Sequence, residues 1–126
     1  MTIDYLARPR PLSPRDDILP VIIGGDFGVY GIGRCFNEAF GCRCICVGSQ
    51  PTDSITRSHF FDVRHVSAHA SDAQLLDVLM SIAGEHADKK LILMANHDIF
   101  SAFVARNMEA LSRHYAVPFP TEEVMD

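Results

Sequence analysis

The sequence predicts an α/β fold of three layers: an open, mostly parallel sheet of four to five strands with helices on both faces. Two short runs, Val21–Ile23 and Leu91–Ala95, are wholly apolar, which is typical of parallel strands buried on both faces. Between them, segments with apolar residues at helical spacing alternate with further short apolar runs. Such a strand–helix alternation favours a parallel sheet whose strands are connected by crossover helices.

Composition and charge narrow the classes of function. The chain has 126 residues, 48% of them hydrophobic and 21% charged, which is typical of one globular domain. Its formal net charge is −5 and its 11 Lys and Arg residues are scattered, which argues against a nucleic-acid-binding surface. No apolar run approaches the length of a membrane span. We therefore expect neither nucleic acid nor membrane as a partner.

Residues 1–18 are expected to form a leader that is extended or mobile, and residues 19–126 to form the α/β domain. Pro9, Pro11 and Pro14 interrupt any helix in the leader. The leader also carries charges and lacks an apolar core, so it does not have the pattern of a secretory signal peptide. The expected location is the cytoplasm.

The first expected strand covers residues 20–24, and a helix follows over about residues 28–40. The glycines between them leave the turn free of side chains, so a ligand could approach backbone N–H groups at the helix N-terminus. Tight strand-to-helix turns also need glycine without any ligand, and both interpretations stay open. Asp26 is the right residue type to cap the helix, and Gly41 to end it.

Gly31 and Gly33 lie inside this helix, where each costs about 1 kcal/mol relative to alanine. Close packing of the helix on the first strand would offset that cost, as would the close approach of a ligand. The spacing alone does not choose between the two.

The second expected strand covers residues 43–47, and with the first strand and helix it completes a β-α-β unit with a right-handed crossover. Cys42, Cys44 and Cys46 alternate along it. Side chains two apart in an unbroken strand lie too far apart for a disulfide and converge poorly on a metal ion. We expect all three to be reduced and buried, as small hydrophobic residues.

The second half of the chain repeats the alternation. A loop over residues 52–58 precedes a third strand over residues 60–66, and Ser71 with Gln74 forms a capping box that begins the next helix, which ends near Gly84. The fourth strand covers residues 91–95. Asn96 is expected to cap a long third helix that extends to about Leu111, and Asp98 suits its first turn. The tail, residues 115–126, is expected to be irregular or a short extended segment.

Ligands of open parallel sheets bind at the carboxyl ends of the strands, near the point where strand order reverses. Two loops at that edge have suitable chemistry, Gly24–Gly28 after the first strand and Asn96–Asp98 after the fourth. Ser49 and Gln50 could form a third wall. His97 and Asp98 are neighbours on a helix start and are not expected to face each other.

A dinucleotide site is not favoured by these residues. No three glycines fit G-x-G-x-x-G: Gly31 and Gly33 fit, but Phe36 stands where the third glycine belongs. The second strand also ends at Gly48, Ser49 and Gln50, without the acidic residue that holds a ribose. A nucleophile elbow and a P-loop lysine are absent from the sequence as well.

Two segments resemble the ATP-grasp carboxylate–amine ligases. They are PVIIGGDFGVYGIGR, residues 20–34, and LILMANHD, residues 91–98, continued by ARNMEALSRHYAVPFP, residues 105–120. The chain is most similar to the Rossmann-like preATP-grasp domain that precedes the ATP-binding lobes, over about residues 19–126. Among these ligases, those that add D-aspartate to a peptidoglycan precursor resemble it most.

The resemblance implies a division of labour. ATP activates a carboxylate to an acyl phosphate, which an amine attacks, and the ATP-grasp lobes carry ATP and Mg²⁺ in the full-length protein. Residues 1–126 would hold no cofactor, no catalytic residue and no metal ligand, and would have no ligase activity alone. The implied role is to bind the small carboxylate or amine substrate. The residues implied on that side of the cleft are Gly24, Gly25, Asp26, Phe27, Gly28, Ser49, His97 and Asp98.

Three further possibilities remain open at this point. The chain could be a stand-alone module that binds or senses a small ligand, and a reading frame that stops at Asp126 would favour that interpretation. Asp26 could also serve only as a helix cap. If ATP-grasp lobes normally cover one face, this domain alone could self-associate through an apolar patch, for which Val117, Phe119 and Val124 are candidates.

Overall fold

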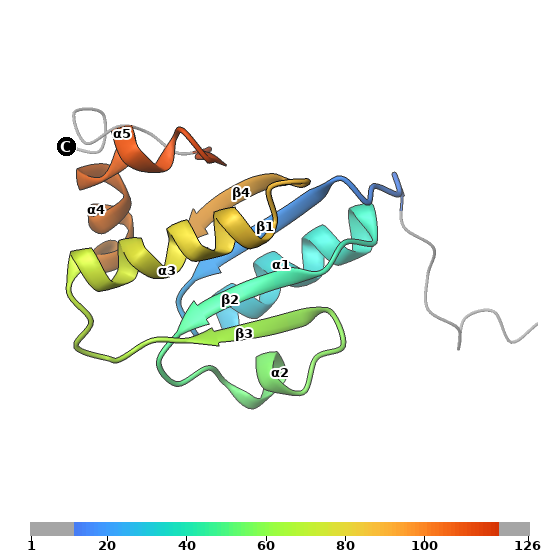
Figure 1. Cartoon of the computed structure of the whole chain (residues 1–126). Coiled ribbons are helices and arrows are strands. Elements are labelled where there is room, and N and C mark those ends of the chain that lie inside the picture. Colours follow the sequence, from blue (N-terminus) through green and yellow to red (C-terminus); the bar gives the residue numbers. More distant parts are fainter. Residues whose placement is uncertain (1–11, 119–126) are drawn as a thin grey trace, which may run out of the picture.

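The computed structural model describes residues 12–118 and confirms the α/β fold, with five parallel strands in the order β3-β2-β1-β4-β5. Helices cover both faces of the sheet (Figure 1). The strands are β1 (Ile18–Ile23), β2 (Cys44–Gly48), β3 (Phe61–His65), β4 (Lys90–Ala95) and β5 (Tyr115–Ala116). The helices are α1 (Phe27–Phe40), α2 (Asp53–Thr56), α3 (Asp72–Glu85), α4 (Asp98–Arg106) and α5 (Met108–Leu111).

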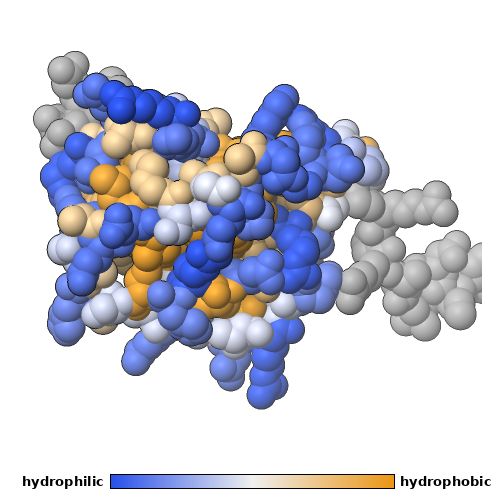
Figure 2. Space-filling view, in the orientation of Figure 1, coloured by the Kyte–Doolittle hydropathy of each residue, from blue (hydrophilic) through white to orange (hydrophobic). Residues whose placement is uncertain are grey.

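The central strand β1 is fully buried and pairs with β2 on one side and β4 on the other. Strand order therefore reverses at β1, which is where open α/β sheets bind ligands. Two apolar clusters lie on the two faces of the sheet. One joins the sheet to α3, α4 and α5, and the other joins it to α1 and α2. On the face that carries α3, hydrophobic residues are visible between hydrophilic side chains (Figure 2).

The three cysteines of the β2 segment are free and buried, as predicted. Each thiol points to a backbone carbonyl on the α1 side of the sheet. Cys42 Sγ lies 3.7 Å from the oxygen of Phe36, Cys44 Sγ 3.8 Å from that of Gly33, and Cys46 Sγ 3.0 Å from that of Gly24. Burial raises the pKa of Cys46 to about 11. These thiols pack the helix against the sheet.

The two helical glycines have different surroundings. A Cβ atom on Gly33 would lie only 2.1 Å from Cζ of Phe61, so α1 needs glycine there to pack on β3. A Cβ atom on Gly31 would meet nothing within 4 Å. Close packing thus explains Gly33, although its partner is Phe61 of β3 and not the first strand as we expected. Within residues 12–118, no packing contact explains Gly31.

Helix α3 begins where the sequence predicts. Ser71 Oγ accepts a hydrogen bond from the Gln74 amide at 3.1 Å, and Gln74 Oε1 accepts one from the Ser71 amide at 2.8 Å. The same end of the helix is tied to α4, because Arg106 Nε lies 3.0 Å from Asp72 Oδ2. The last strand is tied to α3, because the Tyr115 hydroxyl donates to the carbonyl of Leu79 at 2.6 Å.

The structure differs from the predicted elements in two places. The loop after β2 contains the short helix α2, which is held by the fully buried Ile55. The long third helix is divided into α4 and α5 at Asn107, whose side-chain Nδ2 donates to the carbonyl of Phe103 at 2.9 Å. The start of the tail forms β5 beside β4, in agreement with the expected short extended segment. None of these changes the fold class.

The chain before β1 lies along the end of α1. The amides of Leu12, Ser13 and Arg15 donate to the carbonyls of residues 38, 39 and 40 at 3.4, 2.7 and 2.9 Å. Residues 1–11 of the expected leader lie outside the described residues, and the boundary at residue 18 stays a prediction.

The tail patch is described only in part. Val117 is half-buried and packs against the α3-side cluster, while Phe119 and Val124 lie outside the described residues. Self-association through this patch stays a prediction. Within residues 12–118, no helix is both long enough and apolar enough to span a membrane.

Candidate functional site

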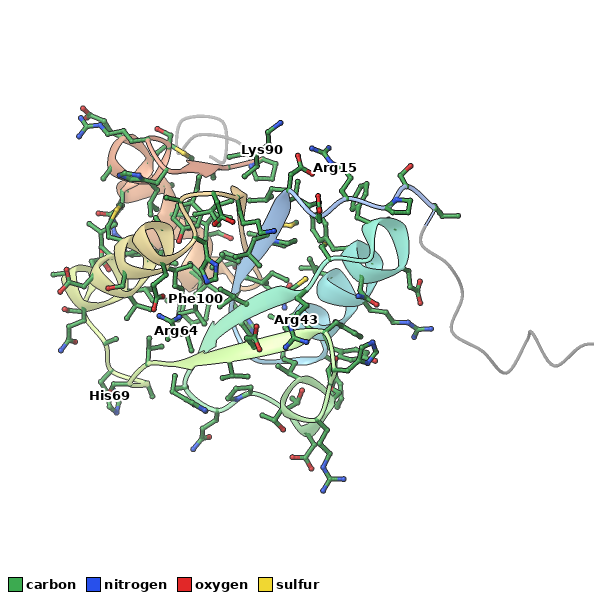
Figure 3. All side chains as sticks on the ribbon, turned by 45° about the vertical axis from the view of Figure 1, so that its right-hand side comes forward. Arg15, Arg43, Arg64, His69, Lys90 and Phe100 are labelled. Atoms are coloured by element: carbon green, nitrogen blue, oxygen red, sulfur yellow. The ribbon has the colours of Figure 1, made fainter. Side chains whose placement is uncertain are left out.

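A cavity of about 300 Å³ opens at the edge of the sheet where the strands end. It brings together the turn after β1, the end of β2 and the turn after β4, as the sequence analysis expected. The residues that line it are Gly24, Gly25, Asp26, Gly48, Ser49, Gln50, Thr52, His97 and Phe100. Phe100 extends into this region from α4 and is labelled in Figure 3. The candidate site is therefore assembled from three segments that lie far apart in the sequence.

Glycine is needed on the floor of the cavity whether or not a ligand binds. Gly24 has φ +135°, and a Cβ atom there would lie 2.9 Å from Cγ2 of Val29. A Cβ atom on Gly48 would lie 2.7 Å from the carbonyl oxygen of Gly24. At the entry to α1, a Cβ atom on Gly28 would lie 2.5 Å from Nδ2 of Asn96. The glycine-rich turn is thus required for packing the two loops together.

Asp26 connects the two loops of the site. Its Oδ1 accepts hydrogen bonds from the amide of Val29 at 3.1 Å and from Nδ2 of Asn96 at 2.6 Å. Its Oδ2 lies 2.8 Å from Nε2 of His97. The N-cap prediction is confirmed, because the contact with Val29 caps α1. Burial opposes the charged form, but the three donors outweigh it and hold the pKa of Asp26 below its ordinary value.

Asn96 does not cap α4, so that prediction is wrong. The helix begins after His97, which makes no capping hydrogen bond with its side chain. The side-chain amide of Asn96 donates a hydrogen bond to the Asp26 carboxylate instead. His97 has φ +146° and ψ +146°, a region in which residues other than glycine are strained by about 1–3 kcal/mol. The start of α4 thus forgoes a good cap, and the structure directs the His97 imidazole toward Asp26.

The predicted site residues fall into two groups. Gly24, Gly25, Asp26, Ser49 and His97 line the cavity. Phe27, Gly28 and Asp98 are exposed at the same edge and are not among the lining residues. As expected, His97 does not pair with its neighbour Asp98; it pairs with Asp26.

Sequence reasoning missed Gly48, Thr52 and Phe100. The amide of Thr52 donates to the carbonyl of Gly25 at 2.9 Å, which closes this side of the cavity. The sequence predicts that the second strand ends at Gly48-Ser49-Gln50, and this strand end was the signal that could have placed Gly48 at the site. Phe100 belongs to the apolar pattern of its helix, and nothing in that pattern distinguishes it from a core residue.

A second cavity, of about 310 Å³, lies at the opposite edge of the sheet, where the strands begin. Arg15 and Arg43 line it, but their guanidinium groups contact Asp17 and Asp62, each at 2.6 Å. The hydrogen bond from Arg15 lowers the pKa of Asp17 to about 2. Arg15 and Lys90 lie near each other in Figure 3, and both contact Asp17. Because carboxylates neutralise its arginines, this cavity is the weaker candidate.

Within residues 12–118, no group of three or more His, Cys, Asp or Glu side chains has a geometry suited to holding a metal ion. We therefore assign no metal ligand in the described part of this chain.

Comparison with known proteins gives one informative relative. No protein-family model and no solved structure matches the chain. The chain is 25% identical over 107 residues to the D-aspartate ligase of Enterococcus faecium (strain Aus0004). The match covers 82% of this chain and 25% of the relative, so the chain spans about a quarter of that protein's length. This similarity indicates a distant relation to a ligase.

Proposed function

We propose that this chain is the N-terminal, substrate-side domain of an ATP-dependent carboxylate–amine ligase of the ATP-grasp family, with D-aspartate as a substrate. In such a ligase, ATP converts a carboxylate to an acyl phosphate, and an amine then displaces the phosphate. This domain contributes one wall of the substrate cleft and is not catalytic alone. A cytoplasmic location belongs to the same proposal, because the reaction consumes ATP.

The similarity to D-aspartate ligase carries this proposal, since it extends over 82% of the chain and not over one motif. The position of the cavity supports it independently. The cavity lies beside β1, where the strand order reverses, and this is the usual ligand position in open α/β sheets.

ATP and Mg²⁺ would be held by ATP-grasp lobes in the same polypeptide, which are the partners we propose for this domain. The role left to this chain is to bind a small carboxylate or amine substrate. The turn Gly24–Gly28 leads into the N-terminus of α1, whose first N–H groups have no partner inside the helix and favour an anion. Ser49 adds a hydroxyl on the opposite wall.

The remaining residues of the proposed site have supporting roles. Asp26 and His97 hold the two loops in register through their 2.8 Å contact. Phe27 and Asp98 are exposed at the rim, and we propose that they contact the substrate or the lobes that close over it.

A hybrid ligase tests this function. The chain would replace the matched quarter of the Enterococcus D-aspartate ligase, and hydroxylamine would trap any acyl phosphate as a hydroxamate. We expect ATP-dependent hydroxamate from D-aspartate with the hybrid, and none with the remaining three quarters or with this chain alone. A folded hybrid that binds ATP but forms no hydroxamate from D-aspartate would count against the proposal. Hydroxamate from this chain alone would refute the division of labour.

A further inference from the structure

His97 occupies a position at which glycine would be less strained. Its φ of +146° is unfavourable for any side chain, and its imidazole does not cap the helix that it begins. The side chain instead lines the carboxyl-edge cavity and contacts the Asp26 carboxylate at 2.8 Å. This arrangement places an imidazole beside the cavity, with its Nε2 against the Asp26 carboxylate.

The contact with Asp26 determines which ring nitrogen carries the proton. A carboxylate only accepts hydrogen bonds, so the Nε2 that faces Asp26 Oδ2 must be the protonated nitrogen. In the neutral imidazole, Nδ1 is then a hydrogen-bond acceptor. Within residues 12–118, no hydrogen bond to this nitrogen is found.

The other polar side chains discussed for the cavity do not offer a group that only accepts hydrogen bonds and is free to bind a ligand. Of the nine lining residues, Asp26 and His97 are the two with charged or titratable side chains. The Asp26 oxygens already accept from three donors, so they offer little to a ligand. Ser49 and Gln50 both donate and accept, which makes them poor discriminators. Nδ1 of His97 is the acceptor whose ring is held by a contact inside the site, that of Nε2 with Asp26.

We infer that Nδ1 of His97 accepts a hydrogen bond from the amino group of an amino-acid ligand, and that Asp26 is the positioning residue that fixes the required tautomer. This inference rests on the proposed function, and it names the chemical group that the site recognises.

The inference sets a pH dependence. When His97 takes a second proton, both ring nitrogens donate, and the amino group loses its acceptor. The charged groups near His97 are Asp26, from the turn before α1, and Asp98, from its own helix. The segment Gly48–Thr52 on the facing wall adds no charged side chain. Affinity for the amino group should therefore be higher for the neutral imidazole than for the imidazolium.

The first arm of the test needs no ligand. Nitrogen-15 NMR of the histidine rings distinguishes the two neutral tautomers, and we expect His97 to carry its proton on Nε2. Asp26→Asn keeps an oxygen that can accept from Val29 but removes the carboxylate, so the Nδ1-protonated tautomer should become populated. Asp53→Asn is the matched control, because it removes the same charge from α2 and should leave the His97 ring unchanged. A wild-type ring with its proton on Nδ1 would overturn the inference.

The second arm compares D-aspartate with succinate, which has the same two carboxylates and no amino group. At about pH 8.5, D-aspartate should bind about tenfold more tightly than succinate. The ratio should fall toward one in Asp26→Asn, while D-aspartate should shift the Nδ1 resonance of the wild-type protein. Equal affinity with an unmoved Nδ1 resonance would overturn the inference and leave the proposed function intact. If neither compound binds the folded chain, the inference and the substrate-side role both fail.

Discussion

Replacing Asp26 by alanine should destabilise the protein more than the loss of an ordinary helix cap. Three contacts are removed together: the cap on Val29, the hydrogen bond from Asn96 and the pair with His97. A lost cap costs about 1 kcal/mol, a lost partner of the half-buried Asn96 amide about 1 kcal/mol, and the largely exposed His97 pair at most about 1 kcal/mol. The expected loss is about 2–3 kcal/mol in the free energy of unfolding.

Ser71→Ala is the matched control for Asp26→Ala. It removes the cap of another 14-residue helix, α3, far from the candidate site, and should cost only about 1 kcal/mol. Urea unfolding followed by circular dichroism measures the stability of both variants. The slope of the unfolding free energy against urea concentration should stay that of the wild type. An Asp26→Ala loss equal to that of Ser71→Ala would refute the claim that Asp26 joins the two loops.

Asp26→Ala should also alter the pH dependence of the protein's stability. The pKa of Asp26 is lower in the folded protein than in the unfolded chain, so the unfolded chain binds more protons at acid pH. The stability that Asp26 contributes is complete above about pH 4, the ordinary range of aspartate, and is lost as pH falls through the folded pKa. The difference in stability between wild type and Asp26→Ala should therefore narrow below about pH 4. A constant difference down to pH 2 would contradict this assignment.

Two further predictions concern packing. Gly33→Ala would place a Cβ atom 2.1 Å from the Phe61 ring and should lower the free energy of unfolding by about 1–3 kcal/mol. The Cβ atom of Gly31→Ala would meet nothing within 4 Å, so this variant should stabilise the protein by up to about 1 kcal/mol. Urea unfolding that ranks the two variants in the opposite order would show that the α1–β3 contact is misassigned. Tyr115→Phe removes the 2.6 Å hydrogen bond to the carbonyl of Leu79. The free energy of unfolding, measured with heat or urea, should fall by about 1 kcal/mol. An unchanged stability would indicate that this bond does not hold β5 to α3.

Local signals in the sequence predicted much of the fold. The apolar run Val21–Ile23 is fully buried in β1, and the capping box at Ser71 forms with both of its hydrogen bonds. Both signals act through neighbouring residues, so the sequence contains them directly. The Asp26 cap belongs to the same kind, because its partner is three residues away.

The contacts that sequence reasoning missed join distant segments. The sequence predicts Asn96 as the cap of the helix that follows it. In the structure, its side-chain amide donates to Asp26, 70 residues earlier in the chain. The division of the third helix at Asn107 depends on a side-chain bond to the carbonyl of Phe103 that competes with the regular helix. The strained backbone of His97 likewise has no signature in local residue types.

Amide chemical-shift mapping with D-aspartate tests the central claim most directly, namely that the carboxyl-edge cavity binds the substrate. We predict shifts at Gly24, Gly25, Ser49 and His97, and no change at Arg43 on the opposite edge of the sheet. Shifts centred on the amino edge, or none at any amide of the folded chain, would contradict the account.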